Sequence, residues 1–514
     1  MNPYAGLPDA PLECVLIMQK PNSRRLSVGS SLSSVQLAAI AQQHPNSTLI
    51  DQVFEMVAHQ VRAGQLLTGR RIASVRQLAL DCEISRDTAT KAYEKLVAHG
   101  FLESRAGSGF YVTTFKTAPV QRVHSGTARV HMFAPHSFRA RLAGSDGVMD
   151  TSLGSGHLPD EWLESAGVAN AMRQVTKGNL RHLNKFASVL GYTPLREQLQ
   201  VRLREFGVLA EQDQIMVTLG ASEALNLIVL SYLQAPGETV LVDNPSSFML
   251  RERLDAAGMN VIGVDRQLDG PDIEQLRALC EQHRPRFFLC SSVLHNPTSS
   301  SIATHKAFQI LRLADEFDLT IVEDDTYGDL SAPARSGQFA RLAALDQLRR
   351  VIYIGSFSKT LGAGLRVGFV AASPERLQWL ALFRHATLLS GTSIAERAVY
   401  NVLSIGNYRH HCEQLRSRLD AQRELVVKAL ERIGLSILQR HDAGMYIWAS
   451  LRDGLKAQAV AEEMFRRGYL TAPGPVFTDG SDPHGAMRFN VASTCDGAAL
   501  SELDRVLTEL SKRQ

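Results

Sequence analysis

The chain has 514 residues, which predicts two or three domains, and its formal net charge of +3 excludes a strongly basic field over the whole surface. Its six cysteines are scattered without the C-x-x-C or Cys/His spacing of a zinc site or a disulfide framework, so we predict no metal site and a reducing compartment. No signal-peptide-like segment and no apolar run near the ~20 residues of a membrane helix occurs, which predicts a cytoplasmic protein without a membrane partner.

Residues 1–47 begin the chain with a mixed composition. They include the polar stretch "PNSRRLSVGSSLSS". We predict a flexible N-terminal extension with a short helix around "VQLAAIAQQ". Its role stays open.

Residues 48–114 carry the signals of a compact helical block that ends in a hairpin. The first helix has Val53, Met56, Val57 and Val61 at helical spacing. Serines stand as N-caps before two further helices, "VRQLALDC" and "RDTATKAYEKLVAHG", with the tight turn "EIS" between them. "FLESRAGSGFYV" then predicts a short β-hairpin with glycines at its tip. This order of features predicts a winged helix-turn-helix domain.

The second helix of this pair is the predicted recognition helix. Its exposed N-terminal half would meet the major groove, while an arginine of the preceding helix and an arginine of the wing would contact phosphates or base edges. An ordinary helical module that binds protein is the alternative, because residues 48–112 hold eight Lys/Arg against seven Asp/Glu. The order of the features favours DNA. The predicted DNA-binding residues are Arg76, Ser85, Arg86, Thr88, Lys91, Arg105 and Gly107.

The same block resembles the GntR-type winged helix. The family pattern "RQLA", "SR.T...AYE.L...G" and "R.GSG..V" is nearly complete here, with Ala73 where the family usually has proline. The resemblance implies a DNA-binding domain.

The rest of the chain divides by composition and periodicity. Residues 115–150 are rich in Ser, Thr, Arg, Gly and Pro, which predicts a linker. From residue 151, short apolar strands such as "ETVLVD" and "RVIYIGS" alternate with helical stretches, as in a mostly parallel sheet covered by helices. We predict a large α/β/α lobe over 151–394 and a small α+β lobe over 395–514. The predicted fold is therefore multidomain, a mainly α winged helix-turn-helix followed by an α/β domain of two lobes.

One lysine, Lys359, stands in the turn "GSFSKTLGAGLRVGF" between two apolar runs. A buried ammonium is costly unless it is paired or neutralised, so a surface turn is the simplest interpretation of an arbitrary lysine. The sharper hypothesis is an amine that is held out of water because it forms a Schiff base.

Pyridoxal 5′-phosphate needs a lysine for its aldehyde, an acid for its ring nitrogen, donors for its phenolate oxygen and a phosphate cradle. Asp324 ends an apolar strand and could keep the ring nitrogen protonated, so that the ring remains an electron sink. Tyr327, three residues later, and Asn296 in "CSSVLHNPTS" could donate to the ring oxygen.

The phosphate cradle is predicted from two turns. In "MVTLGASEALNLIVL", a strand, a glycine turn and a helix would present the backbone N–H groups of Ala221 and Ser222 to a phosphate. Ser356 and Arg366, on either side of the turn lysine, add a hydroxyl and a fixed cation. Each element alone is a weak signal, but all of them follow strands of one α/β domain, where ligand sites lie.

Together these motifs resemble the fold-type I, aspartate-aminotransferase-like family, in the family's order: phosphate turn, N-P, D-x-x-Y, then S-x-S-K…R. The resemblance implies that Lys359 is the catalytic Schiff-base lysine. It also implies that Arg488 in "GAMRFNVAS" clamps the α-carboxylate of a substrate or effector as a bidentate fork, and that Gly156 in "GSGHLP" makes a substrate-side backbone contact.

Two positions depart from the family. Ser247 takes the place of the aromatic residue that stacks on the pyridine ring, with Phe248, which we include among the predicted cofactor-binding residues, next to it. Phe186 stands where the family often has a tyrosine that reaches the phosphate of the partner subunit. Both changes predict a weaker grip on the cofactor and count against efficient transamination.

A GntR-like winged helix, a linker and an aminotransferase-like domain on one chain resemble the MocR-type transcriptional regulators. The resemblance implies a homodimer, operator DNA read as spaced half-sites, and a cofactor that serves to sense an amino acid, an amine or pyridoxal phosphate itself. An aminotransferase that transfers amino groups to 2-oxo acids is the alternative. A mere dimerisation scaffold is a third hypothesis, against which the retained Lys359, Asp324, Asn296 and Arg366 count.

Overall fold

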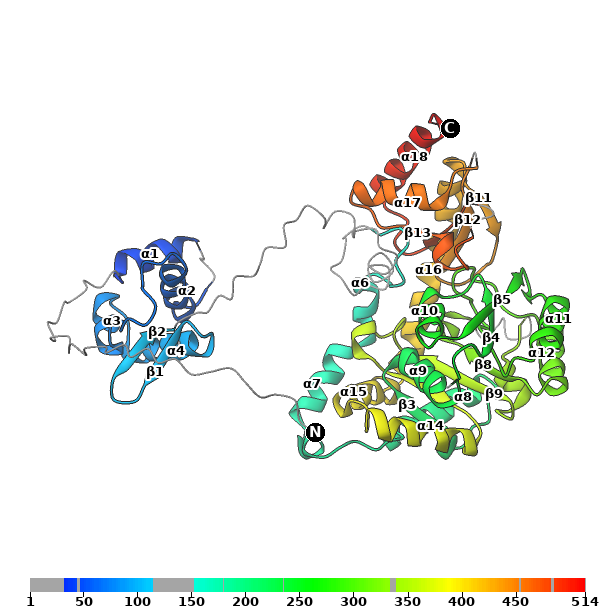
Figure 1. The fold of residues 1–514 in the computed structure, drawn as a ribbon, viewed down its shortest axis with the longest axis horizontal. Helices are drawn as coiled ribbons and strands as arrows, with labels where there is room; N and C mark the ends of the chain where they lie inside the picture. Colours follow the sequence, from blue (N-terminus) through cyan, green and yellow to red (C-terminus); the bar gives the residue numbers. More distant parts are fainter. Residues whose placement is uncertain are drawn as a thin grey trace, which may run out of the picture. The chain divides into compact units, whose positions relative to one another are not determined.

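The computed structural model describes residues 32–43, 47–113, 152–178, 180–233, 235–332, 339–452, 454–481 and 485–513 (Figure 1). The chain forms two compact units, Met1–Thr127 and Ala128–Gln514. The linker predicted over 115–150 lies outside the described residues, as do residues 1–31 of the predicted extension.

The first unit is a winged helix. Its elements are α1 (Ser34–Gln43), α2 (Leu49–Arg62), α3 (Val75–Asp81), α4 (Arg86–Ala98) and the antiparallel hairpin of β1 (Leu102–Arg105) and β2 (Gly109–Val112). The predicted N-caps are confirmed, because the hydroxyl oxygens of Ser74 and Ser85 accept from the backbone N–H groups of Gln77 and Thr88 at 3.2 and 3.0 Å. These caps fix where the two helices begin, and therefore which residues the recognition helix exposes.

Helix α1 belongs to the same core, although its residues lie in the predicted extension. Leu32 and Leu37 are buried with the core residues of α2, α3 and α4. The Nε2 atom of Gln60 on α2 donates to Oε1 of Gln36 on α1 at 2.9 Å. The short helix predicted around "VQLAAIAQQ" is thus present and extends the hydrophobic core of the winged helix.

The second unit is built on a sheet of eight strands in the order β3-β10-β9-β8-β7-β4-β5-β6. The strands β4, β5, β7, β8 and β9 pair in parallel, and β10 and β6 run antiparallel to their neighbours. The bounds are β3 (Ile215–Thr218), β4 (Thr239–Asn244), β5 (Asn260–Gln267), β6 (Gly270–Pro271), β7 (Phe287–Cys290), β8 (Thr320–Asp324), β9 (Val351–Ser356) and β10 (Gly368–Ala371).

Helices cover both faces of this sheet, because alternate strand residues enter two different cores. Ile215 and Val217 of β3 join one core and Met216 joins the other. One face is covered by α7 (Val168–Lys177), α8 (Thr193–Glu205), α11 (Ile273–His283), α12 (Thr304–Glu316), α13 (Leu342–Asp346) and α15 (Ser393–Ser404). The other face is covered by α9 (Gly220–Tyr232), α10 (Phe248–Ala256) and α14 (Pro374–Thr387).

A smaller lobe follows, with the sheet order β11-β12-β14-β13. It contains α16 (Asn407–Arg432), β11 (Ser436–Gln439), β12 (Tyr446–Ser450), α17 (Ala457–Arg466), β13 (Ala472–Pro473), β14 (Ala486–Asn490) and α18 (Gly497–Ser511). The segment 152–163, with α6 (Asp160–Leu163), also joins this lobe, because Leu153 and Leu158 lie in its core. The lobe boundary expected at residue 395 falls inside α15, which packs on α7 and α8 of the large lobe.

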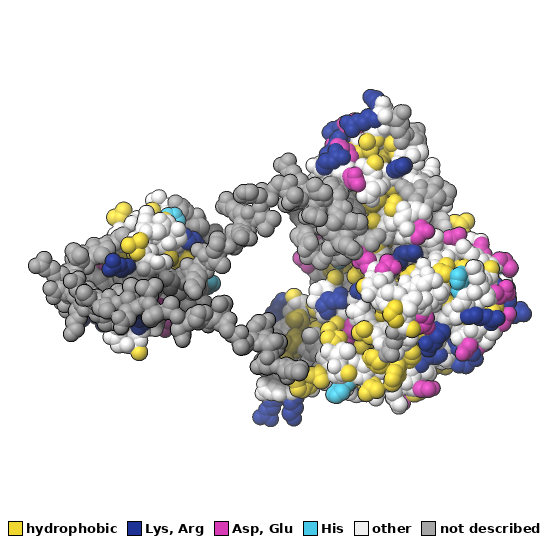
Figure 2. Space-filling model, in the orientation of Figure 1, with side chains coloured by type: hydrophobic (Ala, Val, Ile, Leu, Met, Phe, Trp, Pro, Cys, Tyr) yellow, Lys and Arg dark blue, Asp and Glu magenta, His cyan; other side chains and the backbone are white. Residues whose placement is uncertain are grey.

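The surface of the second unit carries both signs of charge. On the face shown in Figure 2, acidic and basic side chains are interspersed over the large lobe. Within the described part of the chain, no helix is both long and apolar enough to cross a membrane.

The packing of α1 gives a first prediction. Replacing Leu37 by alanine should lower the free energy of opening of α2 by about 2–4 kcal/mol, because a buried leucine side chain is removed from a packed core. Amide hydrogen exchange of the full chain measures this. Val35→Ala on the same helix is the control, since Val35 is 77% exposed and its truncation should change little. Equal exchange in both variants would contradict the assignment of α1 to this core.

Candidate functional site

One pocket in the second unit collects every predicted cofactor and effector residue. It opens where β4, β7, β8 and β9 end at their carboxyl edge, which is where ligands bind in sheets of this kind. The predicted residues that line it are Gly156, Ala221, Ser222, Phe248, Asn296, Asp324, Tyr327, Ser356, Lys359, Arg366 and Arg488. Segments more than 300 residues apart along the chain, such as those of Gly156 and Arg488, thus meet in one site.

Lys359 lies in the pocket, and its Nζ donates to the carbonyl oxygen of Gly156 at 2.8 Å. Burial lowers the pKa of its ammonium group below the ordinary value of 10.5, and the Arg488 and Arg366 guanidiniums act in the same direction. The Asp324 carboxylate opposes this pKa shift. A lysine with a lowered pKa supplies the neutral amine that attack on an aldehyde requires.

The turn around Lys359 is held by the N-terminal part of α16, whose Tyr408 packs in the core of the large lobe. The hydroxyl of Thr360 is 2.7 Å from the Tyr408 hydroxyl, and Nε2 of His411 is 2.6 Å from the Thr360 carbonyl oxygen. Both partners lie on α16. The lysine backbone is therefore fixed by the first turns of α16, about 50 residues later in the chain, which local sequence could not predict.

Asp324 has the geometry of a group that binds a ring nitrogen. Its Oδ1 accepts from the Thr326 backbone N–H at 3.0 Å, while its Oδ2 makes no hydrogen bond with another residue of the described part of the chain. Burial raises the pKa of Asp324, and the Thr326 hydrogen bonds, Lys359 and Arg253 act against this rise. This oxygen of a half-buried carboxylate that lines the pocket is free to accept the N–H of a pyridinium ring.

The ring-oxygen donors and the carboxylate clamp meet on the opposite side. The Tyr327 hydroxyl is 3.0 Å from the Tyr446 hydroxyl, and Asn296 accepts from Arg488 through Oδ1 at 2.7 Å, which leaves its amide N–H₂ available. The Asn296–Pro297 peptide bond is cis. Tyr446 was not predicted, because the strand "GMYIWASL" contains no local motif that marks it.

Arg488 is a buried cation without an acidic partner. Its side chain is 2% exposed and lies 4.3 and 4.7 Å from the Tyr446 and Phe477 ring centroids. It donates to the Gly154 carbonyl at 2.6 Å, and no carboxylate of a described residue forms an ion pair with it. A buried guanidinium in this state favours an anionic ligand, and its planar fork fits a carboxylate.

The opposite end of the pocket suits a phosphate. Ala221 and Ser222 lie in the first turn of α9, and Ser356 and Ser358 line the pocket beside them. Gly220, with φ of +75°, leaves room for Arg366, because a Cβ atom there would lie 3.2 Å from the Arg366 guanidinium. Backbone N–H groups at a helix N-terminus, hydroxyls and a guanidinium form an anion site.

Phe248 lines the pocket, but its ring packs edge-on against Phe477, with centroids 5.9 Å apart. Ser247 lines the pocket as well. His157 is a pocket residue that the sequence analysis missed, although it follows Gly156 directly. Burial, with Lys359 and Arg488 nearby, lowers the pKa of His157 to about 4, so its ring is neutral near pH 7.

These residues fit pyridoxal phosphate. A Cβ at Gly156 would lie 3.6 Å from the Tyr446 hydroxyl and 3.7 Å from Lys359 Nζ, so the glycine keeps open the space beside the amine. When bound, the cofactor supplies an aldehyde and an electron-accepting ring. Lys359 would provide the amine, Asp324 the acid for the ring nitrogen, and Arg366 with the α9 turn the phosphate cradle.

In the winged helix, most of the predicted DNA contacts lie on the surface. Arg76, Ser85, Arg86, Lys91, Arg105 and Gly107 are exposed, and Thr88 is half-buried and hydrogen-bonded to Ser85. The side chains of Arg76 and Arg86 make no ion pair with a residue of the described ranges, which leaves them available to phosphates.

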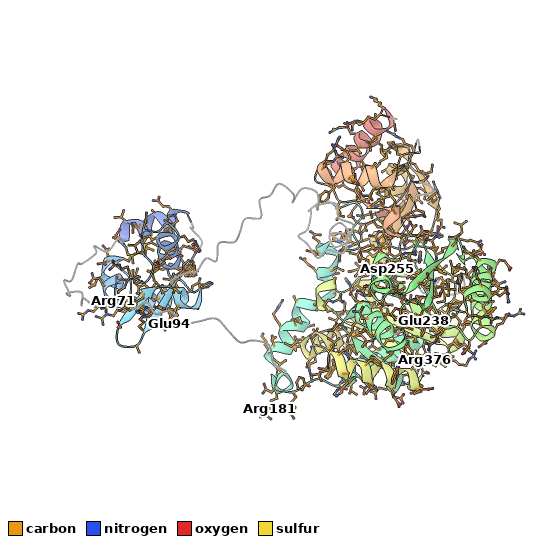
Figure 3. All side chains as sticks on the ribbon, viewed as in Figure 1. Arg71, Glu94, Arg181, Glu238, Asp255 and Arg376 are labelled. Carbon is orange, nitrogen blue, oxygen red and sulfur yellow. The ribbon has the colours of Figure 1, made fainter. Side chains whose placement is uncertain are left out.

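The two other predicted cations of this unit have partners. Lys91 forms an ion pair with Asp87 at 2.7 Å, and Arg105 stacks on the Tyr111 ring at 4.2 Å and pairs with Glu103. Arg71, labelled in Figure 3, was not predicted; it forms a β-bridge with Tyr111 and its guanidinium lies beside Gly109 of the wing.

Comparison with known proteins places both units. Residues 149–506 match the family described as aminotransferase class I and II. The chain belongs to this aminotransferase family. Family members depend on pyridoxal phosphate, in agreement with the predicted cofactor. Residues 49–112 of this aminotransferase-family chain match the bacterial regulatory proteins of the gntR family, so the predicted domain pairing is confirmed.

Relatives whose matches span both units of this chain include proteins named as regulators. The chain is 26% identical over 479 residues to the uncharacterized HTH-type transcriptional regulator YdfD of Bacillus subtilis, covering 90% of this chain and 97% of that one. It is 25% identical to the probable rhizopine catabolism regulatory protein MocR of Rhizobium meliloti, covering 80% and 83%. Among solved structures, a kynurenine aminotransferase of Pyrococcus horikoshii has the same fold as 76% of this chain and 98% of its own, with a TM-score of 0.65 and 23% identity.

The lowered pKa of Lys359 predicts how its amine reacts. In the cofactor-free protein, acetylation of Lys359 by acetic anhydride should reach half its maximum below pH 10.5, because a lowered pKa leaves more neutral amine at each pH. Mass spectrometry of pulse-labelled protein over a pH series measures this. Asp324→Asn should move the midpoint further down, since that carboxylate stabilises the ammonium. A midpoint at or above 10.5 would refute the described electrostatics.

The unpaired arginines predict how DNA binding depends on salt. Arg76→Ala and Arg86→Ala should each reduce the slope of log K against log[salt] by about 0.9 on duplex DNA, the value for one lost phosphate contact. Fluorescence anisotropy titrations at several salt concentrations measure the slope. Arg62→Ala is the control, because Arg62 on α2 is paired with Glu55. The DNA assignment of α3 and α4 fails if all three variants behave alike.

Proposed function

We propose that this protein is a DNA-binding transcriptional regulator that senses an amino acid or amine through its pyridoxal phosphate site. The observation that carries the proposal is the presence, on one chain, of a gntR-type winged helix and of a pocket with Lys359, Asp324 and an unpaired Arg488. An unpaired buried guanidinium that faces a reactive amine suits a ligand with both a carboxylate and an amino group.

A route for coupling is supported by residues 152–157, which follow in sequence the segment that joins the two units. The Gly156 carbonyl accepts from Lys359, and the Gly154 carbonyl accepts from Arg488. Asn490 of β14 donates to the carbonyl oxygens of Ser155 and His157 at 3.0 and 2.7 Å. The backbone of this segment is therefore hydrogen-bonded to the two cations that the ligands use.

Occupation of the site changes those bonds. When the Lys359 amine is bonded to the cofactor, it no longer donates to the Gly156 carbonyl oxygen. A ligand carboxylate competes with the Gly154 carbonyl and the Asn296 amide oxygen for the Arg488 guanidinium. Such competition changes the hydrogen bonds of residues 152–157, and therefore the populations of their conformations. These residues follow in sequence the segment that joins the winged helix to the second unit. Coupling between two sites is typically about 1–3 kcal/mol, or a 5- to 150-fold change in affinity.

We further propose a homodimer that reads spaced half-sites of operator DNA. Phe186 is 82% exposed, and Leu388 and Leu389 at the end of α14 are also exposed. These two segments are linked, because Nη1 of Arg384 on α14 donates to the Val189 carbonyl oxygen at 2.5 Å. Large exposed apolar side chains gathered in one region favour a protein partner, and a second copy of this chain would cover them.

A spectroscopic and DNA-binding experiment tests this function. The full-length protein loaded with pyridoxal phosphate should show a visible absorption band that Lys359→Ala lacks. An effector amino acid should shift that band, and the shifted band should persist. The same amino acid should change the affinity of the protein for the DNA upstream of its own gene by 5- to 150-fold. If the band instead drains to the pyridoxamine form and returns with a 2-oxo acid, without any change in DNA affinity, the protein works as an aminotransferase.

Arg488→Gln separates recognition of the carboxylate from the cofactor. We expect this variant to keep the visible band but to lose the response to amino acids, while retaining the response to a simple amine, because only the carboxylate fork is removed. Absorption titrations measure both responses. Arg505→Gln, an exposed small-lobe arginine paired with Glu502, should behave like the unmodified protein. A normal amino acid response in Arg488→Gln would rule out the clamp.

A further inference from the structure

The phosphate end of the pocket contains a second guanidinium that the sequence analysis did not identify. Arg253, on α10, lines the same pocket as Arg366, Ala221 and Ser222. Its Nε donates to Oδ1 of Asn226 at 3.0 Å, and its Nη1 donates to the Met249 carbonyl oxygen at 2.6 Å.

The Asn226 contact fixes where Arg253 lies. Asn226 is four residues after Ser222 on α9, and residues at this spacing share a helix face. The guanidinium is therefore anchored over the helix face that presents Ser222 to the pocket. Its Nη2 makes no hydrogen bond with a described residue.

The positive charges of Arg253 and Arg366 favour the binding of an anion between the two side chains. Burial lowers the pKa of Arg253, and the Arg366 guanidinium lowers it further, as two like charges in one pocket must. Neither side chain forms an ion pair with a carboxylate in the described ranges.

Three buried arginines outside this pocket form ion pairs with acidic side chains. Arg266 pairs with Asp243 at 2.9 Å, Arg341 with Asp325 at 2.7 Å and Arg384 with Glu223 at 2.8 Å. The chain thus supplies these arginines with an acid of its own. Two adjacent guanidiniums without one match a dianionic ligand.

We propose that Arg253 is a phosphate-binding residue of the cofactor site and shares the 5′-phosphate with Arg366. The inference rests on the pyridoxal phosphate site of the proposed function. It adds a side chain from α10 to the groups of α9 and of the Lys359 turn, so that three segments hold the phosphate.

Binding of pyridoxal phosphate and of pyridoxal, which lacks the phosphate, tests the proposal. Arg253→Gln should weaken binding of pyridoxal phosphate to the cofactor-free protein about ten- to a hundredfold, the effect of one charge-assisted contact. Binding of pyridoxal should stay within about twofold. Absorption titrations give both dissociation constants.

Two further variants keep the test decisive. Asn226→Ala removes the anchor but keeps the charge, so it should produce a smaller loss that is again confined to pyridoxal phosphate, even if Arg253→Gln does not fold. Arg312→Gln, an exposed arginine of α12, controls for a change in net charge and should bind both compounds normally.

The outcomes distinguish the two proposals. If Arg253→Gln and Asn226→Ala weaken the binding of pyridoxal phosphate and of pyridoxal equally, or weaken the binding of neither compound, the phosphate role of Arg253 is overturned. The cofactor site itself would remain in place. Failure of the unmodified protein to bind pyridoxal phosphate would instead remove the cofactor site, and the proposed function with it.

Discussion

An excess of positive charge in one pocket is the constraint on which the second unit depends. Lys359, Arg253, Arg366 and Arg488 line it, and Asp324 is the single carboxylate among its described lining residues. Like charges gathered in a partly buried space are unfavourable unless anions join them. The pocket is therefore electrostatically incomplete by itself. A ligand with a phosphate at one end and a carboxylate at the other would complete it, and pyridoxal phosphate together with the amino acid of the proposed function has this chemistry.

The fold keeps these charges apart and in place. Parallel strands end at one edge of the sheet, so Asp324 of β8 and Ser356 of β9 lie beside each other at the site. The α16 helix holds the Lys359 turn through Tyr408 and His411, and β14 of the small lobe carries Arg488. The amine and the carboxylate clamp thus come from two lobes. A ligand that binds both of them links the two lobes, so its binding can change the arrangement of one lobe against the other.

The departures of this chain from its aminotransferase relatives suit a sensor. Phe248 borders the pocket but packs edge-on against Phe477, so the ring that adjoins the site is already engaged with another aromatic residue. Ser247 offers a hydroxyl where the resemblance to the family predicts an aromatic ring. Lys359 and Arg488 still line the pocket, so the groups for an amine and a carboxylate are retained. Under the proposed function, a change in the DNA affinity of the winged helix would report this recognition.

The sequence by itself determined the local features of this protein. Ser74 and Ser85 define where two helices begin, because N-caps act over three residues. Short motifs that follow strands mark Lys359, Asp324, Asn296 and the α9 turn. The carboxyl ends of parallel strands lie at the same edge of a sheet, so these motifs are expected to lie close together. The winged helix and the cofactor site could therefore be predicted without coordinates.

Only the tertiary structure decided the contacts between segments distant in sequence. Tyr446, His157 and Arg253 reach the pocket from β12, from the segment before α6 and from α10. Tyr446 and Arg253 lie in no motif, and the motif that contains His157 marked only Gly156. The same holds for α1, whose composition does not reveal that Leu37 completes the winged-helix core. Their positions follow from side-chain packing and charge across the folded units, and a chain read in order contains no local signal for such contacts.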